Sequence, residues 1–174
     1  VTGVQTCALP ICFDQALVLL ARRFQGRPWR PAAGPGPGPE RLRLDLSGFG
    51  DLSYVEQVVA LANSRRVRGR TEAVDLFSNH ARWLRYAGGQ VSACSRHRGG
   101  IGWAAAAERR GYLVDLTPFL PGARQRSLRL NPAGPCPSPA VPQRQSYIPP
   151  AALAALIPSL RSGDLALLLP RDPH

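Results

Sequence analysis

Lysine and methionine are absent from the 174-residue sequence, and aromatic residues make up only 7% of it. All 22 basic residues are therefore arginine, and the formal net charge is +11. A high positive charge can serve nucleic-acid binding. Here, however, the arginines are scattered along the chain and not interleaved with aromatic residues in one stripe. We expect no specific nucleic-acid function, and basic nucleic-acid binding stays open as an alternative.

The sequence also lacks long apolar runs and groups of metal-ligating residues. No run approaches the length of a transmembrane helix. No pair of histidines, cysteines or carboxylates has the spacing of metal ligands. The glycines of PGPGPE (35–40) alternate with prolines, which cannot donate the N–H groups that cradle a phosphate. We therefore expect no transmembrane segment, no metal and no other cofactor, and the oligomeric state stays open.

Cysteine is scarce, with four residues in the chain. Cys7 and Cys12 lie in VTGVQTCALPIC (1–12), which resembles the translation of a sequencing adapter, and we leave this segment out of the fold. The true N-terminus and any export signal are then not represented. Cys94 and Cys136 are far apart and give no disulfide framework. We expect Cys94 to be a buried structural cysteine and Cys136 to lie in a proline-rich loop.

Residues 13–174 are expected to form one domain, because a chain of this length suffices for a single core. The 18 prolines and 17 glycines imply long loops, above all at 25–40 and 131–150. Apolar residues at helical spacing predict helices, and alternating or continuous apolar runs predict strands. Helices early and strands late favour an α+β fold. The predicted helices cover 13–24, about 51–63, about 71–86, 103–111 and 150–160, and the predicted strands cover 41–46, 112–117 and 163–170.

The stretch GFGDLSYVEQVVALA (48–62) places a glycine-punctuated turn directly before the second predicted helix. An aspartate at a helix start accepts hydrogen bonds from unpaired backbone N–H groups and suits the helix dipole. We therefore predict that Asp51 caps the helix, while Ser53 and Glu56 have the spacing of a competing capping box. Two catalytic alternatives stay open: Asp51 as a carboxylate nucleophile, and Ser53 as a serine nucleophile.

Three further places carry residues that often do chemistry. Cys94 and His97 are near each other in sequence, which leaves a nucleophile–base pair open as an alternative to a structural cysteine. His80 is expected at the surface or at the edge of the core. Asp115 and Asp164 are expected to hold turns or strand ends.

Several stretches follow one another in a recognisable order: FQGRPW, ERLRLDLSGFG, YVEQVVALA, LRYAGGQV, CSRH with a later Trp, GYLVDLTPFLPG, SYIPP and LRSGDLALL. Together they resemble the N-acetylmuramoyl-L-alanine amidase-like family of bacterial cysteine hydrolases, within the papain-like NlpC superfamily. The resemblance spans nearly all of residues 13–169. It implies a papain-like α+β fold, with N-terminal helices packed on a mostly antiparallel sheet that is incomplete in this chain. It also implies a peptidoglycan amidase or peptidase of the periplasm or cell envelope.

The family motif reads Gly-Phe-Asp-Cys-x-x-Phe-Val-Glu and places the nucleophilic cysteine at a helix start, where the dipole stabilises its thiolate. Asp51 stands at the cysteine position of this motif, and Gly50 stands at the aspartate position. The matching positions are Gly48, Phe49, Tyr54 (a near match to phenylalanine), Val55 and Glu56.

A second region, CSRHRGGIGW (94–103), also departs from the family pattern. Arg98 stands where the family has a histidine, and two glycines replace aromatic residues. The family continues beyond GDLALLLP into the strand that carries its catalytic histidine, whereas this sequence stops at His174, to which we assign no catalytic role. The binding residues that the resemblance implies are Tyr54, Arg96, His97 and Trp103.

We therefore expect a fragment of an amidase-like cysteine hydrolase that is inactive as written, with peptidoglycan or muropeptides as the implied ligand. A non-catalytic wall-binding or interaction module is the alternative from another class. The apolar LALLL run would lack strand neighbours, so we also expect poor solubility.

Overall fold

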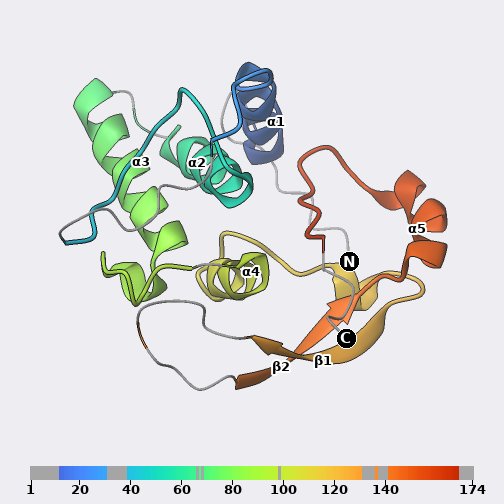
Figure 1. The fold of residues 1–174 in the computed structure, drawn as a ribbon. Helices are drawn as coiled ribbons and strands as arrows, with labels where there is room; N and C mark the ends of the chain where they lie inside the picture. The colour runs from blue at the N-terminus through green and yellow to red at the C-terminus, as the bar shows by residue number, and fades with distance from the viewer. Residues whose placement is uncertain are drawn as a thin grey trace. The chain divides into compact units, whose positions relative to one another are not determined.

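The computed structural model describes residues 12–30, 39–65, 67, 69–97, 99–130, 136 and 141–168. Over these residues the chain is α+β, with five α-helices and one antiparallel sheet of two strands, as the sequence predicts at the level of fold class (Figure 1). The adapter-like residues 1–11 and most of the two predicted loops lie outside the described residues. None of the helices in the described part is long and apolar enough to cross a membrane.

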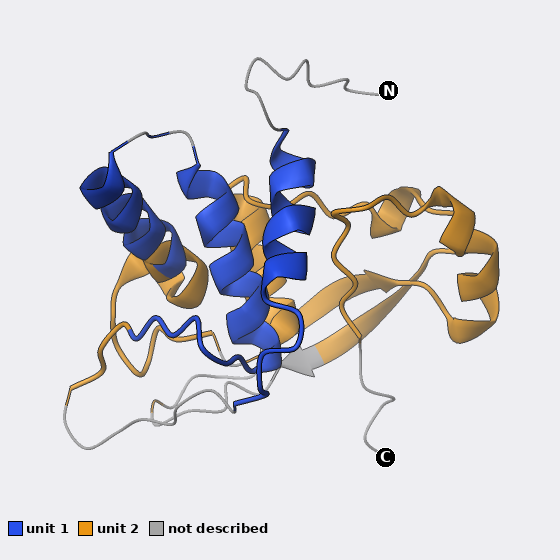
Figure 2. Ribbon diagram, turned by 90° about the horizontal axis from the view of Figure 1, so that it is seen from above, with its two compact units in different colours: residues 1–32, 43–81 blue, residues 33–42, 82–174 orange. Residues whose placement is uncertain are grey.

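The chain divides into two compact units, drawn in blue and orange in Figure 2. Unit 1 comprises residues 1–32 and 43–81, and unit 2 comprises residues 33–42 and 82–174. Unit 1 contains α1 (Phe13–Arg23), α2 (Asp51–Ser64) and most of α3 (Arg70–Arg85). Unit 2 contains the last turn of α3, then α4 (Gly100–Arg109), β1 (Arg124–Leu130), β2 (Val141–Tyr147) and α5 (Pro150–Leu156), with short 3₁₀ turns at Ala87–Gly89, Thr117–Phe119 and Ile157–Ser159.

In unit 1, α1 and α2 pack side by side (Figure 2). The helical spacing of the apolar residues of α2 predicts a largely buried helix, and Val58, Val59, Ala60 and Ala62 are each at most 4% exposed. The predicted bounds of this helix are confirmed to within one residue at its end, Ser64. Among the described residues of unit 1 outside α2, the buried hydrophobic ones are Ala16, Leu17, Phe49, Phe77 and Ala81.

In unit 2, α4 begins at Gly100, three residues before the start of the predicted range 103–111, and ends at Arg109, two residues before the end of that range. Gly111 follows the helix with φ +73°, a backbone conformation that costs glycine little. Its N–H donates to the Glu108 carbonyl (2.8 Å), and the Tyr112 N–H donates to the Ala107 carbonyl (2.9 Å). These two bonds form a Schellman motif, in which Gly111 is the residue that ends the helix.

The predicted strand at 41–46 is wrong, because these residues join no strand ladder. The alternation that prompted the prediction is nevertheless visible in the burial. Leu42, Leu44 and Leu46 are half-buried, while the polar residues between them are exposed. The pattern therefore predicted which side chains face inward, but a strand also needs a partner for its backbone groups.

The predicted strands at 112–117 and 163–170 are wrong as well, over the residues that the structure describes. Residues 117–119 form a 3₁₀ turn, with the Thr117 N–H donating to Asp115 Oδ1 (2.9 Å). In the LALLL run, Leu165, Leu167 and Leu168 are 42%, 45% and 89% exposed. Asp115 holds a turn, as predicted, and so does Asp164, whose Oδ2 accepts the Arg161 N–H (2.7 Å).

The observed sheet, β1 with β2, lies in segments that we did not predict as strands, and β2 falls within the predicted loop at 131–150. The two strands pair antiparallel, with Arg124 opposite Tyr147 and Leu128 opposite Gln143. Residues 124–127 of β1 and 143–146 of β2 are all polar, so neither strand shows the repeated apolar alternation on which strand prediction depends.

The prediction for the cysteines is also wrong. Cys94 is exposed and forms a disulfide with Cys136, 42 residues further along the chain. Sequence spacing does not reveal which cysteines meet, because the fold decides the distance between their Cα atoms, 5.4 Å here.

Candidate functional site

The N-terminus of α2 is the first candidate site, and its cap differs from the predicted one. Gly50 is the N-cap residue, since its carbonyl accepts the Tyr54 N–H (2.9 Å), and Asp51 is the first residue inside the helix. Ser53 is the third residue of the helix, and its Oγ accepts the Gly50 N–H (2.9 Å). The predicted cap by Asp51 and the predicted Ser53–Glu56 box are both wrong. Glu56 instead is a buried residue of the helix, 2% exposed.

Asp51 lies in the first turn with its side chain exposed. Its carboxylate makes no hydrogen bond or ion pair with any residue that the structure describes. A negative charge at this end of a helix is stabilised by the helix dipole by about 0.3–1 kcal/mol. The Ser53 hydroxyl, the other candidate nucleophile, donates to the Gly50 carbonyl (3.0 Å) and accepts the Gly50 N–H. Neither the Asp51 carboxylate nor the Ser53 hydroxyl is hydrogen-bonded to a described side chain that could act as a general base.

Three aromatic rings, from Phe24, Phe49 and Tyr54, pack together at the start of this helix. Phe49 makes edge-to-face contacts with Phe24 (5.2 Å between ring centroids) and Tyr54 (5.4 Å). The Tyr54 hydroxyl donates to the Ala21 carbonyl at the end of α1 (2.9 Å). The resemblance implies Tyr54 as a binding residue, and in the structure its hydroxyl joins α2 to α1.

The turn before α2 is fixed to the segment that follows α1. Trp29 and Phe49 form a parallel backbone bridge, with the Arg30 N–H donating to the Phe49 carbonyl (2.9 Å). Arg30 Nη1 pairs with Asp45 Oδ2 and donates to Ser47 Oγ (3.2 and 3.1 Å). Hydrogen bonds from Ser47, and then the Arg30 charge, hold the pKa of Asp45 below its usual value. The Trp29 side chain remains 68% exposed.

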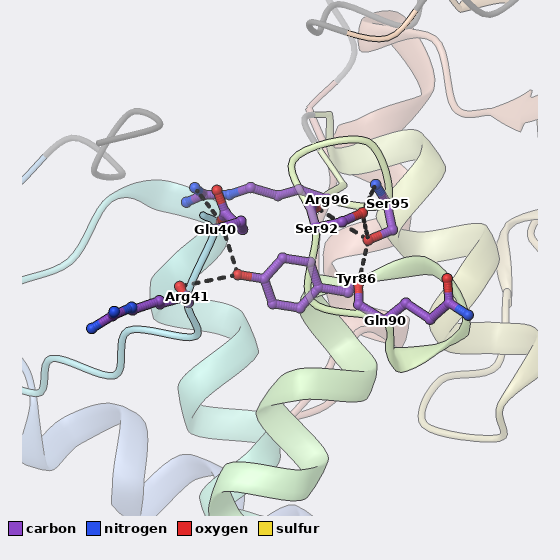
Figure 3. Close-up of polar contacts among 7 residues, drawn as sticks. All are labelled: Glu40, Arg41, Tyr86, Gln90, Ser92, Ser95 and Arg96. Carbon is purple, nitrogen blue, oxygen red and sulfur yellow. Dashed lines mark hydrogen bonds and ion pairs between the residues drawn. The ribbon is translucent and has the colours of Figure 1, made fainter. Parts of the chain in front are cut away.

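A polar cluster in unit 2 forms around Tyr86 (Figure 3). The Tyr86 hydroxyl donates to Glu40 Oε1 (2.9 Å), and Arg96 Nη1 pairs with the same oxygen (3.2 Å). Tyr86 is 1% exposed, and the side chains of Glu40 and Arg96 are 8% and 19% exposed. Burial, with the hydrogen bond and charge of Glu40, raises the pKa of Tyr86 to about 12. These surroundings therefore favour the neutral phenol of Tyr86.

The remaining predicted binding residues belong to unit 2. Arg96 is engaged with Glu40, as described above. The His97 backbone N–H donates to the Arg85 carbonyl (2.9 Å), while its buried Nε2 atom has no partner among the described residues. Burial and the Arg109 charge lower the pKa of His97. Trp103 is 5% exposed, and its indole N–H also lacks a described partner. These residues are packed into unit 2, which leaves their binding role a prediction.

Two other predicted residues have clear surroundings. The sulfur of Cys94 is part of a disulfide, so the Cys94–His97 pair is not a thiol nucleophile and its base in this structure. His80 is half-buried on α3, and burial lowers its pKa, in agreement with a place at the edge of the core.

Comparison with known families shows to which family the chain belongs. The family model described as AmiA-like, N-acetylmuramoyl-L-alanine amidase-like, matches residues 19–170. The chain belongs to this family. No curated protein sequence matches the chain.

Solved structures share the fold of this amidase-like chain. Two crystal structures of an N-acetylmuramoyl-L-alanine amidase from Bacteroides uniformis are 20% and 19% identical, with TM-scores of 0.58 and 0.59. Each comparison covers 68% of this chain and 49% or 48% of the other. A protein from Bacteroides fragilis described as a xylanase is 21% identical, with a TM-score of 0.55 and coverage of 66% and 48%. The chain thus spans about half the length of the structures it matches, and at these identities the likeness shows the fold alone.

The sequence of this amidase-like chain did not predict that Glu40 is buried against Tyr86 and Arg96. Glu40 follows a proline–glycine run and was grouped with the loop at 25–40. A carboxylate within a segment of low complexity gives no local signal of burial. Its partners are 46 and 56 residues away in sequence, and only the fold brings them to it.

Proposed function

We propose that this chain is part of a peptidoglycan amidase-like or peptidase-like cysteine hydrolase of the papain-like NlpC type, and that it does not cleave peptidoglycan. The family match over residues 19–170 supports the class of protein. One observation carries the proposed inactivity: Asp51 occupies the first helical position of α2, where the family motif places its cysteine.

The chemistry of the two side chains explains the proposed loss. A thiol at a helix start becomes a strong nucleophile, because the dipole and the free N–H groups stabilise its thiolate. An ionised aspartate at the same place is stabilised too, but a carboxylate is a weak nucleophile toward an amide carbon. Its oxygens also have no described partner that would orient them. The position is therefore suited to holding a negative charge at the helix start.

Turnover of purified muropeptides tests the proposal directly. We expect the chain and Asp51→Ala to release peptide at the same rate as buffer. Turnover by the chain that disappears in Asp51→Ala would overturn the proposal, because it would make the carboxylate catalytic.

Asp51→Cys tests the environment of the position independently of turnover. If the helix start favours an anion, the new thiol should have a pKa below the ordinary value of about 8.5. The pH dependence of its alkylation by iodoacetamide measures that pKa. The three described native cysteines are disulfide-bonded and do not compete. A pKa at or above 8.5 would remove the physical basis for placing a nucleophile here.

A non-catalytic wall-binding module is the second candidate, and the exposed Trp29 favours it. Its indole is 68% exposed while its backbone is bridged to Phe49, two residues before Asp51. A large aromatic face held on a fixed backbone suits stacking on a sugar ring. Sedimentation with insoluble peptidoglycan should retain the chain and lose Trp29→Ala. Equal retention of both would contradict a role for this side chain.

A further inference from the structure

The disulfide between Cys94 and Cys136 joins two segments of unit 2 that are far apart in sequence. Its Cα atoms are 5.4 Å apart, within the usual range for such bonds. The loop that it closes contains α4 and β1. Cys94 is exposed, so a thiol reagent can reach the bond from solvent.

Cys94 lies in the turn at 92–95, which leads directly into the cluster around Tyr86; Figure 3 shows Ser92 and Ser95 of this turn with the residues of the cluster. Within the turn, the Ser95 N–H donates to Ser92 Oγ (3.1 Å), and the Ser95 hydroxyl donates to the Gln90 carbonyl. The Ser95 carbonyl in turn accepts the Ala87 N–H (2.7 Å).

The residue that follows this turn is Arg96, which connects it to the cluster. Arg96 pairs with Glu40 and forms an antiparallel backbone bridge with Tyr86. The disulfide is thus two residues from the cation of the cluster. Apart from the Ala87–Ser95 bond, the hydrogen bonds made by the Ser92 and Ser95 side chains within the turn are local, spanning five residues or fewer.

We propose that the Cys94–Cys136 disulfide is a redox-sensitive clamp that keeps the turn at 92–95, and with it Arg96, in place against Glu40 and Tyr86. When it is oxidised, the turn is fixed at a point outside its own short hydrogen bonds. When it is reduced, the chain regains the freedom of a long open loop, and the turn loses its covalent link to Cys136. This inference is independent of the proposed function.

Formation of the clamp requires an oxidant, which we identify by class as the disulfide of a thiol–disulfide oxidoreductase or a small-molecule disulfide. The thiolate of one cysteine attacks that disulfide and forms a mixed disulfide, releasing one thiol. The thiolate of the other cysteine then displaces the second thiol. The protein loses two protons and two electrons, and the oxidant becomes two thiols. Such a bond persists in an oxidising compartment and is opened in a reducing one.

The test uses the full chain with Cys7→Ser and Cys12→Ser, so that one cysteine pair remains. Its melting temperature is measured with and without dithiothreitol, and the redox state is read by mass. Amide exchange is followed at Ala87 and His97, whose N–H groups donate to Ser95 and Arg85 carbonyls. We expect reduction to lower the melting temperature by roughly 5–15 °C. Exchange at the two amides should rise about tenfold or more, the mark of local opening.

Two controls make the result specific. Adding Cys94→Ser and Cys136→Ser should reproduce the reduced state and abolish the response to dithiothreitol. The amides of Arg30 and Phe49 in unit 1 should keep their protection upon reduction. Unchanged exchange at Ala87 and His97 in the reduced chain would overturn the clamp. So would the absence of the two-hydrogen mass loss after exposure to oxidised glutathione. If the serine variants fail to fold, reduction of the cysteine-containing chain still decides the matter.

Discussion

Removal of the Tyr86 hydroxyl tests the energetics of the Glu40–Tyr86–Arg96 cluster. In Tyr86→Phe the ring stays in place, but Glu40 Oε1 loses a donor at 2.9 Å while its side chain remains only 8% exposed. A hydrogen bond to a charged group contributes about 1.5–3 kcal/mol. Arg96 still pairs with the carboxylate, so we expect a loss near the lower end, about 2 kcal/mol. That corresponds to a fall in melting temperature of roughly 4–8 °C for a chain of this size.

The pH dependence of this difference supplies the sharper test. The pKa of Tyr86 is raised to about 12 in the folded chain, against about 10 for an ordinary tyrosine. Folding therefore favours the neutral phenol. Its contribution is fully present below about pH 10 and is lost as the pH rises toward 12. The gap between the chain and Tyr86→Phe should thus be constant from pH 7 to 9 and close above pH 10.

Urea unfolding followed by circular dichroism at several pH values measures both effects. Tyr147→Phe is the matched control, because the Tyr147 hydroxyl has no hydrogen bond to a described residue. We expect that control to change stability by less than about 0.5 kcal/mol, as substitutions away from such contacts usually do. Equal losses in the two variants would refute the reasoning. A Tyr86→Phe gap that stays unchanged between pH 9 and pH 12 would refute it as well.

Three further changes test other parts of the structure. The Gly89→Ala substitution should lower the free energy of unfolding by about 2–4 kcal/mol in a thermal unfolding assay, because the φ of Gly89 is +69° and a Cβ atom would stand 2.7 Å from the Trp83 ring. The Gly88→Ala substitution, at φ +64° in open space, should lower it by about 1–2 kcal/mol in the same assay. In NMR titration, His97 should have its midpoint below pH 6.5, and a midpoint above 6.5 would contradict its burial. Since folding favours the neutral imidazole, the contribution of His97 to folding stability is complete above pH 6.5 and falls as the pH decreases. Asp51→Asn should lose only about 0.3–1 kcal/mol of dipole stabilisation in urea unfolding, and a loss above 2 kcal/mol would reveal a bonded carboxylate.

The helices of this chain were predictable, because the information that forms them is local. The apolar spacing of α2 specifies its buried face, and α4 ends where the N–H groups of Gly111 and Tyr112 donate to the carbonyls of Glu108 and Ala107. Pro150 begins α5, as its fixed φ and missing N–H favour at a first helical position. Each of these signals acts within one or two turns.

The sheet was not predictable in the same way. The Leu42–Leu44–Leu46 alternation correctly indicated which side chains are more buried, but no described strand pairs with that segment. The polar β1 and β2 form the ladder instead. Strand formation depends on a partner that supplies hydrogen bonds, and a single segment carries no record of that partner.

The candidate site divides along the same line. The sequence by itself determined that a helix starts at Asp51 and that a carboxylate stands where the family motif has a thiol, because both are properties of a few adjacent residues. The tertiary structure alone decided that Gly50 caps this helix, that Cys94 meets Cys136, and that Glu40 is buried against Tyr86. A cap depends on the backbone conformation of one residue, and a disulfide or a buried ion pair depends on distances across the folded chain. Those quantities exist only once the chain has folded.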